Sequence, residues 1–149
     1  MDDVDYMQAA LDASREVVGR TGNNPAVGCV VVLNGEIVAT GATQPPGGRH
    51  AEVVAIAAAE ARGTPIDQCE IYVTLEPCSF QGLTPACSGF LVGKRPRRIV
   101  VGIRDPHPRV RGSGIAELRA AGIDVLEGVL ADKVAAHLEH WIRKFSESA

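Results

Sequence analysis

The sequence is poor in the features that mark nucleic-acid-binding and membrane proteins. Aromatic residues make up only 4% of its 149 residues, and 18 acidic against 15 basic side chains leave a formal net charge of −3. No run approaches the roughly 20 apolar residues that cross a bilayer. The first residues, MDDVDYMQ, are acidic where a signal peptide is basic. We therefore expect a cytoplasmic protein without a membrane partner, and the composition argues against nucleic acid as its partner.

Cysteine is also scarce, and the few cysteines present are candidates for metal binding. The four cysteines are expected to stay reduced in the cytoplasm, which favours metal binding or packing over disulfides. With 46% hydrophobic residues, a chain of this length buries on folding roughly 70% of the surface that its unfolded form exposes, so it does not need disulfides to be stable. No linker or internal repeat interrupts it, so we expect residues 1–149 to form a single domain.

The hydrophobic pattern alternates between helices and strands after an opening helix and hairpin. Asn34-Gly35 is a strong signal for a tight hairpin turn. Strands that alternate with helices require crossover connections and a largely parallel sheet, to which the hairpin adds one antiparallel pair. We predict an α/β fold, a three-layer α/β/α sandwich with a five-stranded mixed sheet and helices on both faces. The expected helices are 4–20, 50–62, 85–91, 115–121 and 131–145, and the expected strands are 27–33, 36–40, 71–75, 98–103 and 123–126.

Four polar residues fall where strands end or helices begin. His50 and Glu52 open a helix, Cys78 follows a strand, and Cys87 lies in the first turn of another helix. Ligands in such sheets collect outside the carboxyl ends of the strands. One imidazole and two thiolates suit zinc, and three protein ligands leave its fourth position open to water. The positive ends of helix dipoles favour the thiolates.

Glu52 has the position of a proton carrier. It follows His50 by two residues, which on a regular helix would point it away, but a residue at the helix boundary need not have helical dihedrals. Its carboxylate can then reach a zinc-bound water, whose pKa is lowered to about 7, and pass the proton to substrate nitrogens. Attack of hydroxide on a ring carbon that bears an amino group, with loss of ammonia, needs no organic cofactor.

The His-x-Glu and Pro-Cys pair is the signature of zinc deaminases, usually closed by a second cysteine after two residues. Here eight residues separate Cys78 from Cys87 within TLEPCSFQGLTPAC. With NNPAVGCVVV upstream and DPHPRVRGSGIAELRAAGIDV downstream, the chain from about residue 7 to about residue 134 resembles the deaminase domain of the bifunctional riboflavin-biosynthesis deaminase/reductase, in the cytidine-deaminase-like superfamily.

This resemblance implies roles for individual residues. His50, Cys78 and Cys87 match the zinc ligands and Glu52 the proton-transfer residue. Two further residues belong to the substrate site by the same resemblance, since Asn24 matches a residue that holds the base and Asp105 lies in the substrate-binding Asp-Pro loop. It also implies a homodimer or homotetramer, a small amino-heterocycle as substrate with water as the second reactant, and here a deaminase domain without its reductase.

The chain departs from the family in the loops that contact substrate. Where the family usually carries a histidine or aromatic pair and then a basic residue, this chain has Phe80 and Leu83, and the family's Asp-Pro-Asn ends here in His107. A charge-assisted bond to phosphate contributes about 1.5–3 kcal/mol, and leucine removes it. Two interpretations stay open. Either basic residues of the neighbouring loop bind the phosphate in place of the missing cation, or the substrate is a different pyrimidine, purine or pterin. The candidates for compensation are Arg104, Arg109 and Arg111.

Other interpretations of the same residues stand beside these. The zinc could be structural, with His107 as its fourth protein ligand, in a non-catalytic binding protein. Alternatively, the deaminase could act on a base of a nucleic acid, but such an enzyme needs aromatic side chains for stacking, and these are few here. For residues outside the candidate site the pattern predicts packing or surface positions without a chemical role. We expect Cys29 and Cys69 to be packing residues, Trp141 and Phe145 core or subunit contacts, His137 and His140 surface residues, and the basic residues of 94–98 a solvated turn.

Overall fold

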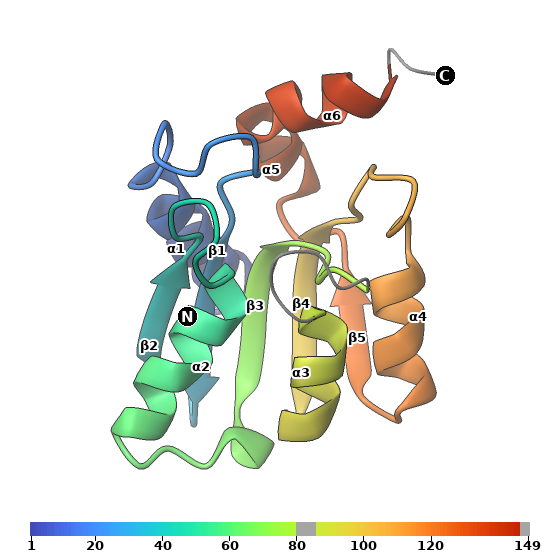
Figure 1. Ribbon diagram of the computed structural model, residues 1–149. Helices are drawn as coiled ribbons and strands as arrows, with labels where there is room; N and C mark the ends of the chain where they lie inside the picture. The colour runs from blue at the N-terminus through green and yellow to red at the C-terminus, as the bar shows by residue number, and fades with distance from the viewer. Residues whose placement is uncertain (80–85, 147–149) are drawn as a thin grey trace.

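The computed structural model describes residues 1–79 and 86–146 (Figure 1). Its helices are α1 (Asp3–Arg15), α2 (Ala51–Ala61), α3 (Cys87–Lys94), α4 (Ser113–Ala120), α5 (Ala131–His137) and α6 (Glu139–Ser146), with a short 3₁₀ turn, η1 (Ile66–Gln68). Its strands are β1 (Gly28–Leu33), β2 (Glu36–Ala42), β3 (Glu70–Leu75), β4 (Arg98–Ile103) and β5 (Asp124–Glu127). None of the described helices is long and apolar enough to cross a membrane.

The five strands form one mixed sheet in the order β2-β1-β3-β4-β5. The expectation of a single antiparallel pair was wrong, because β1 lies between β2 and β3 and is antiparallel to both. The pairs β3–β4 and β4–β5 are parallel, as expected. Four of the strands therefore run in one direction, and the carboxyl ends of β2, β3, β4 and β5 lie at the same edge of the sheet.

The hairpin between β1 and β2 confirms the turn prediction. Asn34 and Gly35 both have positive φ, 51° and 80°, the combination that a type I′ turn requires and that asparagine and glycine tolerate best. The strands on either side pair antiparallel from Leu33 and Glu36 outward. The Asn34-Gly35 turn thus determines where β2 begins.

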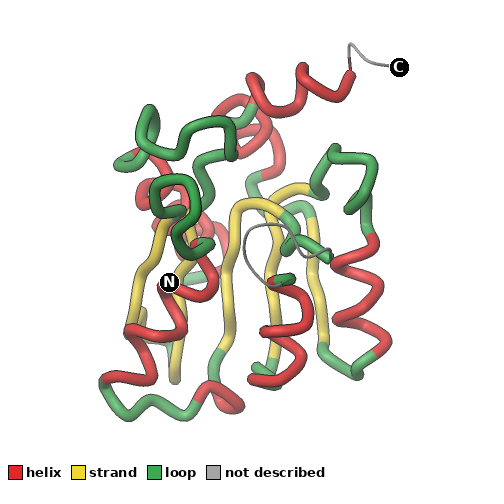
Figure 2. Tube along the Cα trace, viewed as in Figure 1, coloured by secondary structure: helices red, strands yellow, loops and turns green. Residues whose placement is uncertain are grey.

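Helices cover both faces of the sheet, which confirms the predicted three-layer fold (Figures 1 and 2). Helices α1 and α5 lie on one face, and α2, α3 and α4 lie on the other. The alternation along β1 shows both interfaces, since Val30 and Val32 join the cluster beneath α1 while Val31 joins the larger core. At Gly28 a Cβ atom would come within 1.8 Å of the Ala10 carbonyl oxygen, so glycine is what lets α1 approach the sheet this closely.

The helix ends differ from expectation in three places. Helix α1 ends at Arg15 rather than residue 20, and Val18 beyond it is 60% exposed, so burial of this side chain does not favour a longer helix. The single helix expected at residues 131–145 is divided into α5 and α6, because Leu138 between them departs from helical dihedrals (φ −99°, ψ 17°). Helix α3 continues past its expected end at residue 91 to Lys94, and the Arg95 that follows has left-handed dihedrals. Its expected start at residue 85 lies outside the described residues.

The basic segment at residues 94–98 is only partly the solvated turn that was expected. The Arg98 guanidinium lies 2.5 Å from Asp3 and 2.8 Å from Glu70, and it donates to the Tyr72 hydroxyl at 2.9 Å. These contacts join the start of α1 to the beginnings of β3 and β4. The cluster therefore stabilises the edge of the sheet opposite the carboxyl ends.

Candidate active site

Three elements bring their ends together at the carboxyl edge of the sheet. His50 is the N-cap of α2 and has extended backbone dihedrals (φ −75°, ψ 161°). Cys78 follows the end of β3 by three residues, and Cys87 is the first residue of α3. Because α2 and α3 both begin at the edge where β3 ends (Figure 1), residues 37 positions apart in the sequence meet in space.

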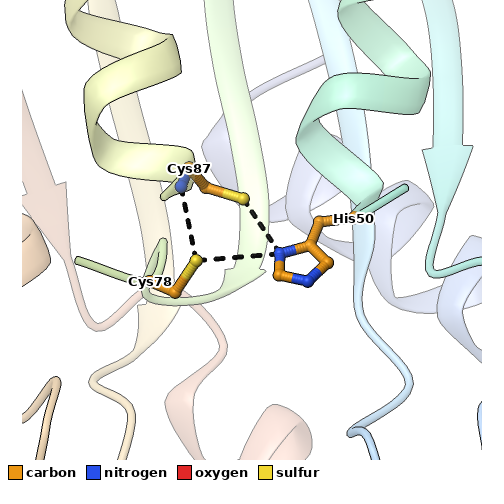
Figure 3. Close-up of side chains that lie close together, drawn as sticks. All are labelled: His50, Cys78 and Cys87. Carbon is orange, nitrogen blue, oxygen red and sulfur yellow. Dashed lines mark hydrogen bonds between the residues drawn. The ribbon is translucent and has the colours of Figure 1, made fainter. Parts of the chain in front are cut away.

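The three side chains point toward one another (Figure 3). His50 Nδ1 lies 3.0 Å from Cys87 Sγ and 3.7 Å from Cys78 Sγ. The backbone N–H of Cys87 also donates to Cys78 Sγ at 3.3 Å. All three potential ligand atoms lie within 4.8 Å of one another. The structure thus brings together the three residues that the sequence proposed as metal ligands.

The surrounding groups already favour a thiolate at Cys78. The pKa of the Cys78 thiol is lowered to about 4, first by the hydrogen bond from the Cys87 side chain and then by those from His50 and the Cys87 backbone. The pKa of the Cys87 thiol is raised, because the Cys78 hydrogen bond and burial both hold its proton. The pKa of His50 is raised in turn, chiefly by its hydrogen bond with Cys78. Within this hydrogen-bonded cluster Cys78 is therefore the group that most readily becomes a thiolate.

The donor set fits a zinc ion with one coordination position left over. Two ligands of a tetrahedral zinc lie roughly 3.4–3.8 Å apart, given Zn–S near 2.3 Å and Zn–N near 2.0–2.1 Å. The 3.7 Å between His50 Nδ1 and Cys78 Sγ falls in this range, and the 3.0 Å between His50 Nδ1 and Cys87 Sγ is shorter. Within residues 1–79 and 86–146, no fourth histidine, cysteine or carboxylate joins the group. His107, the expected candidate for a closed structural site, instead contacts Phe145 at 4.8 Å between ring centroids.

Glu52 lies beside this cluster, buried in the protein at 4% exposure. The extended N-cap at His50 turns its imidazole back toward the cavity that Glu52 also lines, which is how two residues two positions apart serve the same space. Burial raises the pKa of the Glu52 carboxyl. A carboxyl group with a raised pKa can hold a proton and release it near neutral pH.

A cavity of about 210 Å³ opens in front of the cluster. The three expected substrate residues of the described chain, Asn24, Asp105 and His107, all line it together with His50, Glu52 and Cys78. The other two, Phe80 and Leu83, lie outside the described residues. None of the arginines expected to compensate for Leu83 is among the described lining residues, and Arg104 instead makes a two-point contact with Glu127 at 2.7 and 3.0 Å.

Glu76 is a residue of this region that the sequence analysis missed. It is 2% exposed, and its carboxylate accepts hydrogen bonds from three backbone N–H groups, those of Asp105 at 3.0 Å, Gly112 at 2.9 Å and Ile115 at 3.0 Å. It therefore ties the end of β3, one residue before Pro77-Cys78, to the loop after β4 and to α4. The available signal was an acidic residue at the end of an apolar strand, where a buried charge needs several donors.

Two residues of the last helices lie elsewhere than expected. Trp141, expected in the core or at a subunit contact, lines the cavity, and its indole N–H donates to Asp105 Oδ1 at 2.8 Å. His137, expected at the surface, is half-buried with its Nε2 3.0 Å from the hydroxyl of Ser14. Trp141 belongs to α6, beyond the break at Leu138, whereas His137 is the last residue of α5. Cys29 and Cys69 are buried, as expected for packing residues.

Comparison with known proteins places the chain in a class. The family model described as the cytidine and deoxycytidylate deaminase zinc-binding region matches residues 1–103. The chain therefore belongs to the cytidine and deoxycytidylate deaminase family, and fold, family and donor set define a zinc-dependent hydrolytic deaminase. This confirms the expected zinc cofactor and the expected enzyme class.

Within that class the chain is similar to riboflavin-biosynthesis proteins. It is 42% identical over 136 residues to the riboflavin biosynthesis protein RibD of Actinobacillus pleuropneumoniae, covering 91% of this chain and 35% of that protein. The solved structure of a deaminase/reductase of Thermotoga maritima is 36% identical with a TM-score of 0.91, and the match covers 98% of this chain and 42% of that chain. The solved structure of Acinetobacter baumannii RibD is 35% identical with a TM-score of 0.89, and the match covers 97% of this chain and 40% of that chain. The chain spans about a third of the length of the curated relatives it matches.

Proposed function

We propose that this chain deaminates an amino-substituted pyrimidine that carries a ribosyl phosphate. The observation that carries the proposal is a three-donor cluster, His50, Cys78 and Cys87, whose first two members line one cavity together with the buried carboxyl group of Glu52. The Thermotoga maritima relative is named a diaminohydroxyphosphoribosylaminopyrimidine deaminase as well as a reductase, and the deaminase part of that name matches the chemistry of this site.

In this proposal the ligands are His50, Cys78 and Cys87, and the bound zinc supplies water acidic enough to give hydroxide at neutral pH. Glu52 takes one proton from the attacking water and delivers it to a ring nitrogen of the substrate, then takes the proton of the newly added hydroxyl group and delivers it to the departing amino group. One C–O bond forms and becomes a carbonyl, one C–N bond breaks, and ammonia leaves with the second proton. Burial favours this role, because desolvation raises the pKa of the Glu52 carboxyl and so helps it to take up the proton of the attacking water.

The cavity walls orient the substrate. Asn24 supplies an amide with both a donor and an acceptor, and Asp105 and His107 approach from the loop after β4. Asp105 keeps a defined position because its Oδ1 accepts both the His107 backbone N–H at 3.0 Å and the Trp141 indole N–H. The base is thereby held against the metal cluster by groups from both ends of the chain.

The decisive variant is Glu52→Gln, assayed by ammonia release from the phosphoribosylaminopyrimidine. We expect it to fold and to keep about one zinc per chain while turnover falls by several powers of ten, since the amide cannot carry the proton. Glu60→Gln is the matched control, as Glu60 lies on the same helix and pairs with Lys94 at the surface. Near-normal ammonia release by Glu52→Gln would remove Glu52 from the mechanism.

The ligand assignment has its own test, which does not depend on the substrate. Cys87→Ser should lose most of the zinc measured by elemental analysis, because a serine hydroxyl is a poor zinc ligand. Cys69→Ser is the matched control, a buried cysteine whose thiol donates to the Pro65 carbonyl at 3.3 Å. If zinc-loaded wild-type protein binds the pyrimidine but releases no ammonia, the chain is a binding protein and the proposed function is wrong.

A further inference from the structure

A second, larger hollow opens beside the catalytic cavity. Its volume is about 760 Å³, and it lies between the segment at residues 18–26 and the last two helices, α5 and α6. Asn24, Pro25 and Trp141 line both hollows. The two spaces therefore share a wall, and a ligand held at the metal cluster can extend past these three residues into the larger one.

The catalytic cavity alone is too small for the whole proposed substrate. Its volume of about 210 Å³ is below the roughly 300–1,000 Å³ of sites that enclose drug-sized ligands. It has room for a substituted pyrimidine ring but not for a ribosyl phosphate in addition. The sugar and phosphate must therefore leave the cavity, and the neighbouring hollow is the described space that adjoins it.

The charges in the larger hollow suit an anion. Among the residues that the structure describes, its ionisable lining residues are two histidines, one arginine and one lysine, and none of the lining residues is a carboxylate. Arg143 contacts Glu139 one turn earlier at 2.5 Å, but both side chains are more than half exposed, and an exposed pair of this kind contributes little and exchanges partners readily. The Lys144 ammonium lies 5.4 Å from the centre of the Trp141 ring, next to the residue that joins the two spaces.

We propose that this basic groove, defined by His137, His140, Arg143 and Lys144, binds the phosphate of the substrate, with Arg143 and Lys144 as its specificity-determining residues. The inference rests on the proposed function and deepens it. It also bears on Leu83, which stands where the family usually has a cation. The charge that the loop lacks is supplied from α6, a helix far from that loop in the sequence.

The first test compares two substrates in one variant. In Arg143→Gln/Lys144→Gln, kcat/KM for the phosphorylated pyrimidine should fall at least tenfold, as expected from the loss of charge-assisted bonds, while the dephosphorylated compound keeps its wild-type kcat/KM. Arg97→Gln removes one exposed cation at the opposite edge of the sheet and should alter neither value. Equal losses on both substrates, or no loss on either, would overturn the phosphate subsite.

The second test does not require turnover. Trp141 is the sole tryptophan of the chain and borders the groove, so its fluorescence reports on occupancy there. Ribose 5-phosphate should change the wild-type emission saturably, ribose should not, and the double variant should need at least tenfold more ribose 5-phosphate. If the wild type shows no saturable response, the subsite is wrong even where deamination is found. A normal response without deamination keeps the groove and refutes the proposed function instead.

Discussion

The indole N–H of Trp141 donates a 2.8 Å hydrogen bond to Oδ1 of Asp105, which lies 36 residues earlier in the chain. The bond connects α6 to the loop that follows β4, and both residues line the catalytic cavity. Asp105 is buried, and burial raises the pKa of its carboxyl group. A helix at the end of the chain thus helps to hold a polar group that the substrate is expected to meet.

Replacing Trp141 by phenylalanine tests this relationship. Trp141→Phe keeps an aromatic wall but removes one donor from a buried carboxyl group, which should lower the free energy of unfolding by about 1–2 kcal/mol and raise KM more than it lowers kcat. Unfolding in urea is followed by circular dichroism. Tyr6→Phe is the control, because it removes the 2.6 Å bond to the Gly35 carbonyl at the hairpin turn, and should lower stability with KM unchanged. An unchanged KM in Trp141→Phe would contradict the positioning role.

Glu76 should be more important to stability than any exposed carboxylate. In Glu76→Gln one oxygen becomes an NH₂ group that faces a backbone N–H, leaving a buried donor unpaired. We expect the free energy of unfolding to fall by about 2–3 kcal/mol and zinc to be released at a lower chelator concentration, because Cys78 follows two residues later. Glu127→Gln, which weakens exposed pairs with Arg104 and Arg119, should cost less than about 1 kcal/mol. Equal effects of the two variants would refute this ranking.

Gly114 allows α4 to pack closely against the segment that carries Cys78. A Cβ atom at this position would lie 2.0 Å from the Pro77 carbonyl oxygen, so Gly114→Ala must displace either α4 or the segment that carries Cys78. Overpacking of this kind costs about 1–3 kcal/mol, and zinc affinity should fall with it. Gly93→Ala is the matched control, since a Cβ there meets no atom within 4 Å and alanine favours α3 by up to about 1 kcal/mol. A Gly114→Ala protein with wild-type stability and zinc affinity would show that the contact relaxes freely.

His137 should make stability depend on pH. Burial lowers its pKa, with Arg15 adding repulsion and a hydrogen bond with the Ala26 backbone opposing both. The unfolded chain, with a histidine pKa near 6.5, then binds more protons than the folded protein, so this contribution is fully present above about pH 6.5 and is lost as pH falls through the lower folded value.

The measurement is the free energy of unfolding between pH 7.5 and pH 5. His137→Gln should flatten the decline that the wild type shows on acidification, because glutamine does not titrate and can still contact the Ser14 hydroxyl. His140→Gln, on the exposed side of α6, serves as the histidine-to-glutamine control. Parallel declines in the wild type and in His137→Gln would show that other groups cause the pH dependence.

The sequence by itself determined the alternation of helices and strands, the Asn34-Gly35 turn and which three residues are the candidate metal donors. These depend on local rules, namely hydrophobic period, positive φ at two adjacent residues, and the ligand preference of zinc. It also placed the donors correctly at helix starts and a strand end, because ligands of such sheets gather there.

What the tertiary structure alone decided was the direction of β1, the role of Glu76 and the place of Trp141. Each depends on contacts between segments distant in the sequence. β1 pairs with β3, although β2 and α2 lie between them in the sequence. The Glu76 carboxylate accepts hydrogen bonds from N–H groups of residues 29 to 39 positions later. The Trp141 indole N–H donates to Asp105, 36 positions earlier. Hydrophobic periodicity carries no information about such pairings, because it registers only that a side chain is buried and not which distant group it meets.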